Sequence, residues 1–342
     1  MTSPAPSVSV TSSARSLGSG VWFGLASAAA FGTSGTFAKG LLGAGWSPAA
    51  AVTVRIIGAA LVLVVPALVM LRGRWHLLRR NAVLVVTFGL FAMAACQLFY
   101  FNAVRTLSVG VALLLEYLGI VLVVVWLWLR RGQTPRRWTM VGIVASIGGL
   151  LLVLDVTGGM HVDVAGVLWG LAAAVGLATY FVLSARDATG LPPLVLAAAG
   201  MVVGAVGLVA AGLLGLVPMR WTTGDVLFAG SLVPWWAPIV GLCVLSTAFA
   251  YATGVTATRR LGSKVASFLG LTEVLASILV AWLLLGEMPM PVQLLGGVLI
   301  IGGVVAVRYD ELTHGAPDAG AAGAVEADAG APTSDPVPTA AA

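Results

Sequence analysis

Charged side chains are scarce in this sequence. They make up 9% of its 342 residues, whereas soluble globular proteins carry about 25%. Hydrophobic residues account for 59% of the chain, and its mean hydropathy is +1.03. Because so few charges cannot solvate the surface of a chain of this length in water, the composition excludes an ordinary soluble domain. It predicts a protein whose solvent is a lipid bilayer.

Cysteine and histidine are also rare. The two cysteines, Cys96 and Cys243, lie inside apolar runs, which is typical of small core residues rather than of a disulfide framework. The three histidines, His76, His161 and His314, fall in expected loops or in the C-terminal tail. A GxxxxGK[ST] motif is absent, so ATP is not the direct energy source. We therefore expect no metal, no cofactor and no enzymatic activity.

Long apolar runs fill most of the chain. A helix needs about 20 apolar residues to cross a hydrocarbon core of roughly 30 Å. Ten runs of this kind are present, at 21–42, 49–71, 82–104, 107–129, 138–155, 164–185, 191–217, 234–258, 265–285 and 291–308. The alternating pattern that a membrane barrel requires is missing. The sequence therefore predicts an all-α integral membrane protein with ten transmembrane helices.

The two ends of the chain lack the composition of a folded core. Residues 1–19 are rich in Ser, Thr and Pro, and we expect a disordered N-terminal tail. A cleaved signal peptide is not expected, because the first apolar run is long enough to span a membrane and nine more follow. Residues 309–342 are mostly Ala, Gly, Pro and acidic residues in low-complexity order, which predicts a disordered acidic C-terminal tail.

Basic residues are distributed unevenly between the two sides of the predicted bundle. The net charge of +5 would also suit nucleic-acid binding, but in membrane proteins Lys and Arg record topology, and no nucleic-acid partner is expected. With a cytoplasmic N-terminus, the inner side receives 14 of the 18 basic residues. These are Arg15, Arg72, Arg74, Arg79, Arg80, Arg130, Arg131, Arg136, Arg137, Arg186, Arg259, Arg260, Lys264 and Arg308. The bias predicts that both termini are cytoplasmic in a multi-pass protein of the cell membrane.

The chain contains an internal repeat. The later helices of its two halves align at a constant offset of 154, with pairs that include Arg105/Arg259, Leu107/Leu261, Leu115/Leu269, Gly142/Gly296 and Gly149/Gly303. The first helices align at an offset of 146, where GVWFGLASA from Gly20 matches GVLWGLAAA from Gly166. Each repeat has five helices, residues 20–156 and 164–308. Because five is odd, the second repeat is inverted in the membrane, as in secondary transporters.

These residues resemble a known family. The segments LGE and Pro289 near Leu285, VRIIGAALVL from Val54, FYFNAVRTLSVGVALLLEYLG from Phe99 and LSTAFAY from Leu245 look like the EamA repeats of the drug/metabolite transporter superfamily. The branch that they resemble most is that of the threonine/homoserine exporters. The resemblance implies two inverted five-helix EamA repeats. The family usually has proline where this chain has Ile120 and Val274, so a helix break is not predicted there.

Four charged residues within the membrane are candidates for function, since an ionisable group there costs about 2.5–3.5 kcal/mol. Glu116 lies in the middle of an apolar run and suits proton binding or a structural ion pair with Arg55 or Lys39. The guanidinium of Arg55 suits a substrate carboxylate. Lys39 is near a helix end and can either contribute to binding or extend to the interface. The resemblance assigns Glu273 to structure, to proton coupling or to both.

Weaker candidates are polar or sit at a helix end. Gln97, Tyr100 and Tyr251 lie in apolar runs and could bind a solute or bond across helices. Glu287 ends its helix, where an exposed cap or a loop contact is expected.

Three classes of function remain open at this point. The leading one is a secondary active transporter that works by alternating access, and the resemblance implies proton-coupled export of amino acids such as threonine or homoserine. Import or export of another small organic solute or drug is the alternative. A remote one is an intramembrane serine protease, because GTSG at Gly32–Gly35 matches a rhomboid-like GxSG, although no histidine lies in an apolar run. A scaffold or receptor role is not excluded, and homodimerisation is left open.

Overall fold

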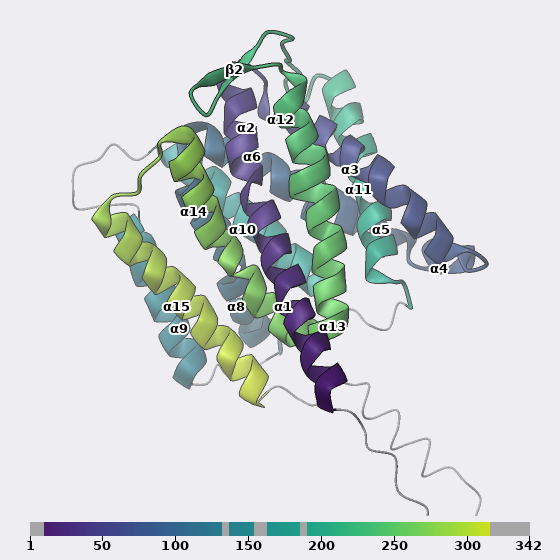
Figure 1. The fold of residues 1–342 in the computed structure, drawn as a ribbon, viewed down its shortest axis with the longest axis vertical. Helices are drawn as coiled ribbons and strands as arrows, with labels where there is room; N and C mark the ends of the chain where they lie inside the picture. Colours follow the sequence, from purple (N-terminus) through teal and green to yellow (C-terminus); the bar gives the residue numbers. More distant parts are fainter. Residues whose placement is uncertain (1–9, 132–136, 154–162, 185–189, 315–342) are drawn as a thin grey trace, which may run out of the picture.

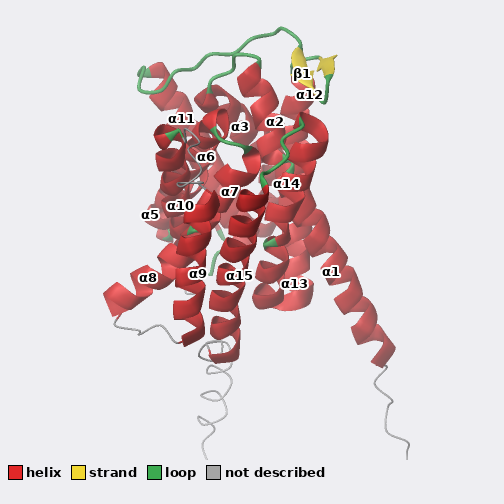
Figure 2. Cartoon of the chain, turned by 90° about the vertical axis from the view of Figure 1, so that its left-hand side faces the viewer, coloured by secondary structure: helices red, strands yellow, loops and turns green. Residues whose placement is uncertain are grey.

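Long helices form a bundle that carries a short β-hairpin at one end (Figure 1). The structure is a computed structural model that describes residues 10–131, 137–153, 163–184 and 190–314. We call the end with the hairpin the hairpin end. At the opposite, tail end lie the start of the first helix and the end of the last described helix (Figure 2).

The elements of the first half are helical. They are α1 (Val10–Gly32), α2 (Ser34–Gly43), α3 (Pro48–Leu71), α4 (Trp75–Arg80), α5 (Ala82–Thr87), the π-helix η1 (Phe88–Ala95), α6 (Cys96–Thr106), α7 (Val109–Tyr117), α8 (Gly119–Arg131) and α9 (Arg137–Val153).

The second half adds the hairpin to a similar set of helices. Its elements are α10 (Val164–Ser184), α11 (Pro193–Leu213), β1 (Val226–Phe228), β2 (Ser231–Val233), α12 (Trp236–Val240), the π-helix η3 (Gly241–Phe249), α13 (Ala250–Gly270), α14 (Thr272–Leu285) and α15 (Pro291–His314).

Parts of both expected tails are helical in the described residues. Helix α1 begins at Val10 and α15 ends at His314, so residues 10–19 and 309–314 belong to helices. Their helices continue directly from the packed segments, and this continuity outweighs their polar composition. Residues 1–9 and 315–342 lie outside the described part of the chain.

Within the described residues, six helical segments are long and apolar enough to cross a membrane. They are Pro48–Leu71, Ala82–Thr106, Val109–Trp126, Val164–Ser184, Pro193–Leu213 and Trp236–Gly254. Three shorter apolar helices are Arg137–Val153, Thr272–Leu285 and Pro291–Ala306. A multi-pass helical architecture follows from these lengths and from their mean hydropathy.

The chain reverses direction within α13. The first part of α13 runs toward the start of α1. Its first residue, Ala250, accepts a hydrogen bond from Ser27 of α1 at 2.7 Å, and Leu261 lies against Gly20. The residues that follow lie against later positions of α1, and α14 lies against Gly32 at its end. The second part of α13 and α14 therefore run back toward the hairpin end.

The two repeats exchange their first helices. Helix α1 of the first half packs on α13 and α14, whereas α10 of the second half packs on α6, α7 and α8. A Cβ atom added to the glycines at these crossings would come within 2.6–2.9 Å of a leucine side chain, so any larger residue would require that leucine to shift. The contacts are Gly20–Leu261, Gly24–Leu269, Gly166–Leu107 and Gly170–Leu115. Because these leucines are equivalent at the offset of 154, the two crossings are the same contact made twice.

Helices α9 and α15 form a second symmetric pair. Gly149 packs against the carbonyl of Gly296, and Gly303 packs against the carbonyl of Gly142. Gly142 and Gly149 are equivalent to Gly296 and Gly303, so the two helices cross antiparallel about a local twofold axis. Figure 1 shows the pair at the edge of the bundle.

Three of the long helices are interrupted, at Thr33, Leu118 and Leu271. The last two breaks occur beside Ile120 and Val274, where the lack of proline gave no reason to expect them. Next to the break at Leu118, Gly119 approaches the backbone of α10 so closely that a Cβ atom would lie 2.5 Å from the carbonyl oxygen of Ala174.

The loop at the hairpin end is tied to the bundle. The strands pair antiparallel, with Val226 opposite Val233. Phe228 stacks on Phe37 of α2 at a ring distance of 5.3 Å. Trp46 Nε1 donates to the carbonyl of Thr222 at 3.1 Å. The hairpin thus covers the ends of α2 and α3.

Side-chain caps begin several of the helices at this end, including α3 and α10. Ser47 accepts a hydrogen bond from the backbone N–H of Ala50 at the start of α3, and Asp163 accepts one from Ala165 at the start of α10. Hydrogen bonds, first from the Thr106 side chain and then from the backbone, lower the pKa of Asp163. Such caps satisfy N–H groups that a helix leaves free at its first turn.

Candidate functional site

Arg55 is buried in the first half of α3, with 4% of its surface exposed. Its Nε donates to the hydroxyl of Thr247 at 3.0 Å, and its Nη1 donates to Oε1 of Gln97. Its guanidinium lies 5.7 Å from the ring centre of Phe101. Across the described part of the chain Arg55 has no carboxylate within ion-pair distance. A buried cation without a carboxylate partner can bind an anionic group of a ligand.

Two π-helices lie on either side of Arg55. Segment η1, which precedes Gln97, and segment η3, which contains Thr247, occupy equivalent places in the two repeats, since Phe88 plus 154 is position 242. Thr247 also donates to the carbonyl of Leu242, five residues before it, at 2.7 Å. Because π-helices are rare and occur often at functional sites, this paired irregularity supports a candidate site at the level of Arg55.

Glu116 is buried near the end of α7, with 6% exposed. Its Oε1 receives a hydrogen bond from the thiol of Cys96 at 3.4 Å, and the same sulfur lies 3.4 Å from the carbonyl oxygen of Ala173. In the described residues Glu116 forms no ion pair with Arg55 or Lys39. The carboxyl group is thus held by one weak donor, and it can bind and release a proton without breaking a salt bridge.

Glu273 lies in the first turn of α14. It accepts a hydrogen bond from the hydroxyl of Tyr117 at 2.9 Å, and that hydroxyl lies 3.2 Å from the carbonyl oxygen of Gly270. Tyr117 ends α7 and Gly270 ends α13. The carboxylate therefore sits where two interrupted helices meet.

Lys39 belongs to a separate arrangement near the hairpin end. It forms an ion pair with Glu287, and its Nζ donates to the carbonyl of Leu107 at 2.9 Å. Glu287 also accepts a hydrogen bond from the N–H of Val109 at 3.0 Å, at the start of α7. The expected cap at Glu287 is therefore present, but its side chain is only 19% exposed. This clasp joins α2, α7 and the loop before α15.

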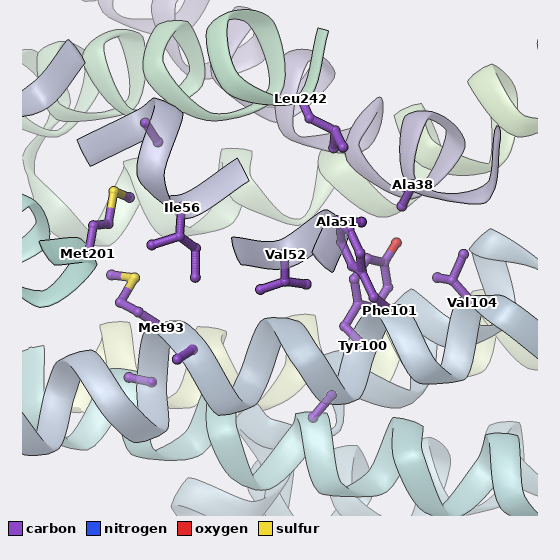
Figure 3. Packing of buried hydrophobic residues seen from close by; sticks show 14 of the residues in the cluster. Ala38, Ala51, Val52, Ile56, Met93, Tyr100, Phe101, Val104, Met201 and Leu242 are labelled. Carbon is purple, nitrogen blue, oxygen red and sulfur yellow. The ribbon is translucent and has the colours of Figure 1, made fainter. Parts of the chain in front are cut away.

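Both candidate tyrosines lie beside the buried charges. Tyr100 is 3% exposed, and its hydroxyl is so close to Gly35 that no Cβ atom would fit there. The hydroxyl of Tyr251 lies 3.7 Å from the sulfur of Met93. Figure 3 shows the apolar layer around this level, with Tyr100 and Met93 among its members.

Electrostatic interactions join the buried groups. Arg55 interacts with Tyr251, Tyr100, Glu116 and Glu273. With Gln97, these residues form what we call the polar centre, and six of the seven candidate side chains belong to it. Only Lys39 does not, because it is paired with Glu287 elsewhere.

Three contributors were missed from the sequence. Cys96 was assigned to the apolar core, and Tyr117 was not considered. Glu287 was not recognised as the partner of Lys39. The only signal for Tyr117 is a hydroxyl inside an apolar run next to Glu116, and no spacing rule connects Glu287 with Lys39, because they are far apart in the chain.

The serine of the GTSG segment is placed unfavourably for catalysis. Ser34 is 5% exposed, and its Oγ has no hydrogen-bond partner in the described residues. A nucleophilic serine requires a base within hydrogen-bond reach. The position of one histidine, His161, cannot be compared with that of Ser34, because His161 lies outside the described part of the chain.

Comparison with known proteins supplies the family. The model of the EamA-like transporter family matches residues 18–155 and 164–309. One solved structure, described as "Crystal structure of protein", shares 22% identity with a TM-score of 0.55 and covers 87% of this chain and 98% of its own. That likeness supports the fold alone. A comparison with curated proteins gives no match. The family match covers both repeats, and the chain belongs to the EamA-like transporter family, whose members are multi-pass membrane transporters of small solutes.

Proposed function

We propose that this protein is a secondary active transporter that exports small amino acids across the cell membrane in exchange for protons. The substrate class we favour is that of threonine and homoserine. The observation that carries the proposal is the buried guanidinium of Arg55, which has no carboxylate partner in the described residues. An amino-acid carboxylate supplies the anionic partner that this position lacks.

The acids of the polar centre supply the coupling. A zwitterionic substrate carries an ammonium group as well as a carboxylate, and Glu116 and Glu273 lie within electrostatic range of Arg55. Neither acid is in an ion pair within the described ranges. A proton bound at one of them competes with the substrate's ammonium group, which is the condition for exchange of protons against substrate.

Ten spans and two cytoplasmic termini complete the proposal. The interrupted pair α1 and α2, the reversal within α13, and the nine apolar segments of sufficient or nearly sufficient length support ten crossings. The start of α1 and the end of α15 share the tail end (Figure 2). The excess of basic residues in the loops assigned to that side supports a cytoplasmic tail end.

Transport by the full-length protein in reconstituted vesicles tests this function. We expect labelled L-threonine to move against its gradient when a proton gradient is imposed, and Glu116→Gln to abolish the dependence on the proton gradient. Asp225→Asn is the matched control, because Asp225 is an exposed carboxylate in a loop. Unchanged coupling in Glu116→Gln would remove Glu116 from the mechanism. Preference for a cationic drug such as tetraphenylphosphonium over L-threonine would favour the alternative substrate class.

A further inference from the structure

Tyr117 touches both of the helix breaks at the centre of the bundle. It is the last residue of α7, immediately before the break at Leu118. Its hydroxyl reaches the carbonyl of Gly270, the last residue of α13, immediately before the break at Leu271. The same hydroxyl reaches Glu273, in the first turn of the next helix. One side chain thus connects the interrupted helices of the two repeats.

The hydroxyl has a single proton and two acceptors within reach. When Glu273 is a carboxylate it can only accept, so the Tyr117 O–H donates to it, and the carbonyl of Gly270 loses that donor. When Glu273 is protonated, its own O–H can donate to the Tyr117 oxygen, and the Tyr117 O–H is then free to donate to Gly270. No covalent bond other than that to the bound proton changes in this exchange.

We propose that Tyr117 acts as a hydrogen-bond switch, which transmits protonation of Glu273 to the helix breaks at Leu118 and Leu271. The role of this switch in transport rests on the proposed function. In that role, Glu273 is a proton site and Tyr117 is the residue that positions it. Because Glu116 directly precedes Tyr117 in the chain, any shift of the break at Leu118 also moves the second acid.

The electrostatic surroundings of Glu273 are mixed. The charged or titratable groups that interact with it are Arg55 from α3, Glu116 and Tyr117 from α7, Tyr100 from α6 and Tyr251 from α13. Arg55 favours the carboxylate, whereas Glu116 opposes it. Substrate bound at Arg55 would weaken the first influence, so substrate and proton would act on the same switch.

Hydrogen exchange and infrared spectroscopy of the full-length protein in nanodiscs test the switch without transport. Infrared spectra over a pH series follow the carboxyl band that Glu273→Gln removes. Amide exchange of residues 117–120 and 270–274, corrected for the intrinsic effect of pH, follows the breaks. In the wild type we expect exchange at 270–274 to be about fivefold slower when Glu273 is protonated, the effect of one neutral hydrogen bond. In Tyr117→Phe we expect Glu273 to titrate still, with less than about a twofold change in exchange.

Control variants keep the inference falsifiable. Tyr180→Phe removes the hydroxyl of another half-buried tyrosine, in α10, and we expect it to behave like the wild type. Glu273→Gln should hold the exchange pattern of the protonated state at every pH. A pH-linked change in exchange that persists in Tyr117→Phe or in Glu273→Gln would overturn the inference. Loss of this linkage with transport intact refutes the switch alone, whereas linkage without transport of any solute refutes the proposed function alone.

Discussion

Replacing Arg55 with methionine should separate binding from stability. The variant removes a cation that is 96% buried, since 4% of it is exposed, and that has no carboxylate partner in the described residues. Methionine is long and flexible enough to occupy much of the same space. A residue that serves the fold should destabilise the protein when it is removed, whereas a residue that serves a ligand should not.

The magnitude follows from the contacts of the guanidinium. The change loses two hydrogen bonds to Thr247 and Gln97, each of which contributes about 1.5–3 kcal/mol when a charged group takes part. It also removes the desolvation penalty of a buried ion, which is several kcal/mol. Thr247 keeps its bond to Leu242. We therefore expect the free energy of unfolding to stay within about 1 kcal/mol of the wild type or to increase.

Thermal denaturation in detergent, with and without L-threonine, measures both effects. We expect Arg55→Met to keep or raise the melting temperature and to lose the stabilisation by L-threonine. Arg105→Met is the control, because Arg105 is exposed; its stability should change by less than about 0.5 kcal/mol, with ligand stabilisation retained. A fall of several degrees in Arg55→Met, together with undiminished stabilisation by L-threonine, would refute the argument and make Arg55 structural.

Two further predictions concern the packing and the clasp. Gly303→Ala should lower the free energy of unfolding by about 1–3 kcal/mol, because its Cβ atom would meet the backbone of Gly142. Gly302→Ala is the control and should leave the melting temperature unchanged, because the space around Gly302 is open. Equal effects of the two variants would contradict the contact. Lys39→Met should lower the free energy of unfolding by about 1 kcal/mol or less, because the ion pair with Glu287 is partly exposed. A double-mutant cycle with Glu287→Gln that shows no coupling would remove the clasp as a source of stability.

Sequence reasoning succeeded where one repeat could be compared with the other. The offset of 154 already paired Leu107 with Leu261, and the offset of 146 paired Gly20 with Gly166. The sequence could not tell that each glycine meets the leucine of the opposite repeat, because an alignment identifies equivalent positions but not their contacts. The breaks at Leu118 and Leu271 were not predicted, because neither has the proline that marks a helix break in a sequence.

The charged residues of the candidate site could be predicted from the sequence, but their hydrogen-bond partners could not. Arg55, Glu116 and Glu273 were identified because ionisable groups are costly in lipid, a rule that needs only one residue at a time. Their partners depend on backbone irregularities that no apolar periodicity encodes. Thr247 reaches Arg55 from a π-helix, and Tyr117 reaches Glu273 from the end of a broken helix.

The exchange of first helices constrains how such a transporter can move. Because α1 packs on α13 and α14, and α10 packs on α6 to α8, the units that could rock are not the two repeats but two mixed groups of helices. Arg55 donates to one residue of each group, to Gln97 of α6 and to Thr247 of η3, a segment that packs on α1 and α13. If the groups moved relative to each other, one of these bonds would be strained or broken. A carboxylate that replaces the lost bond would stabilise the moved state, and substrate binding and rocking would then be coupled at a single guanidinium.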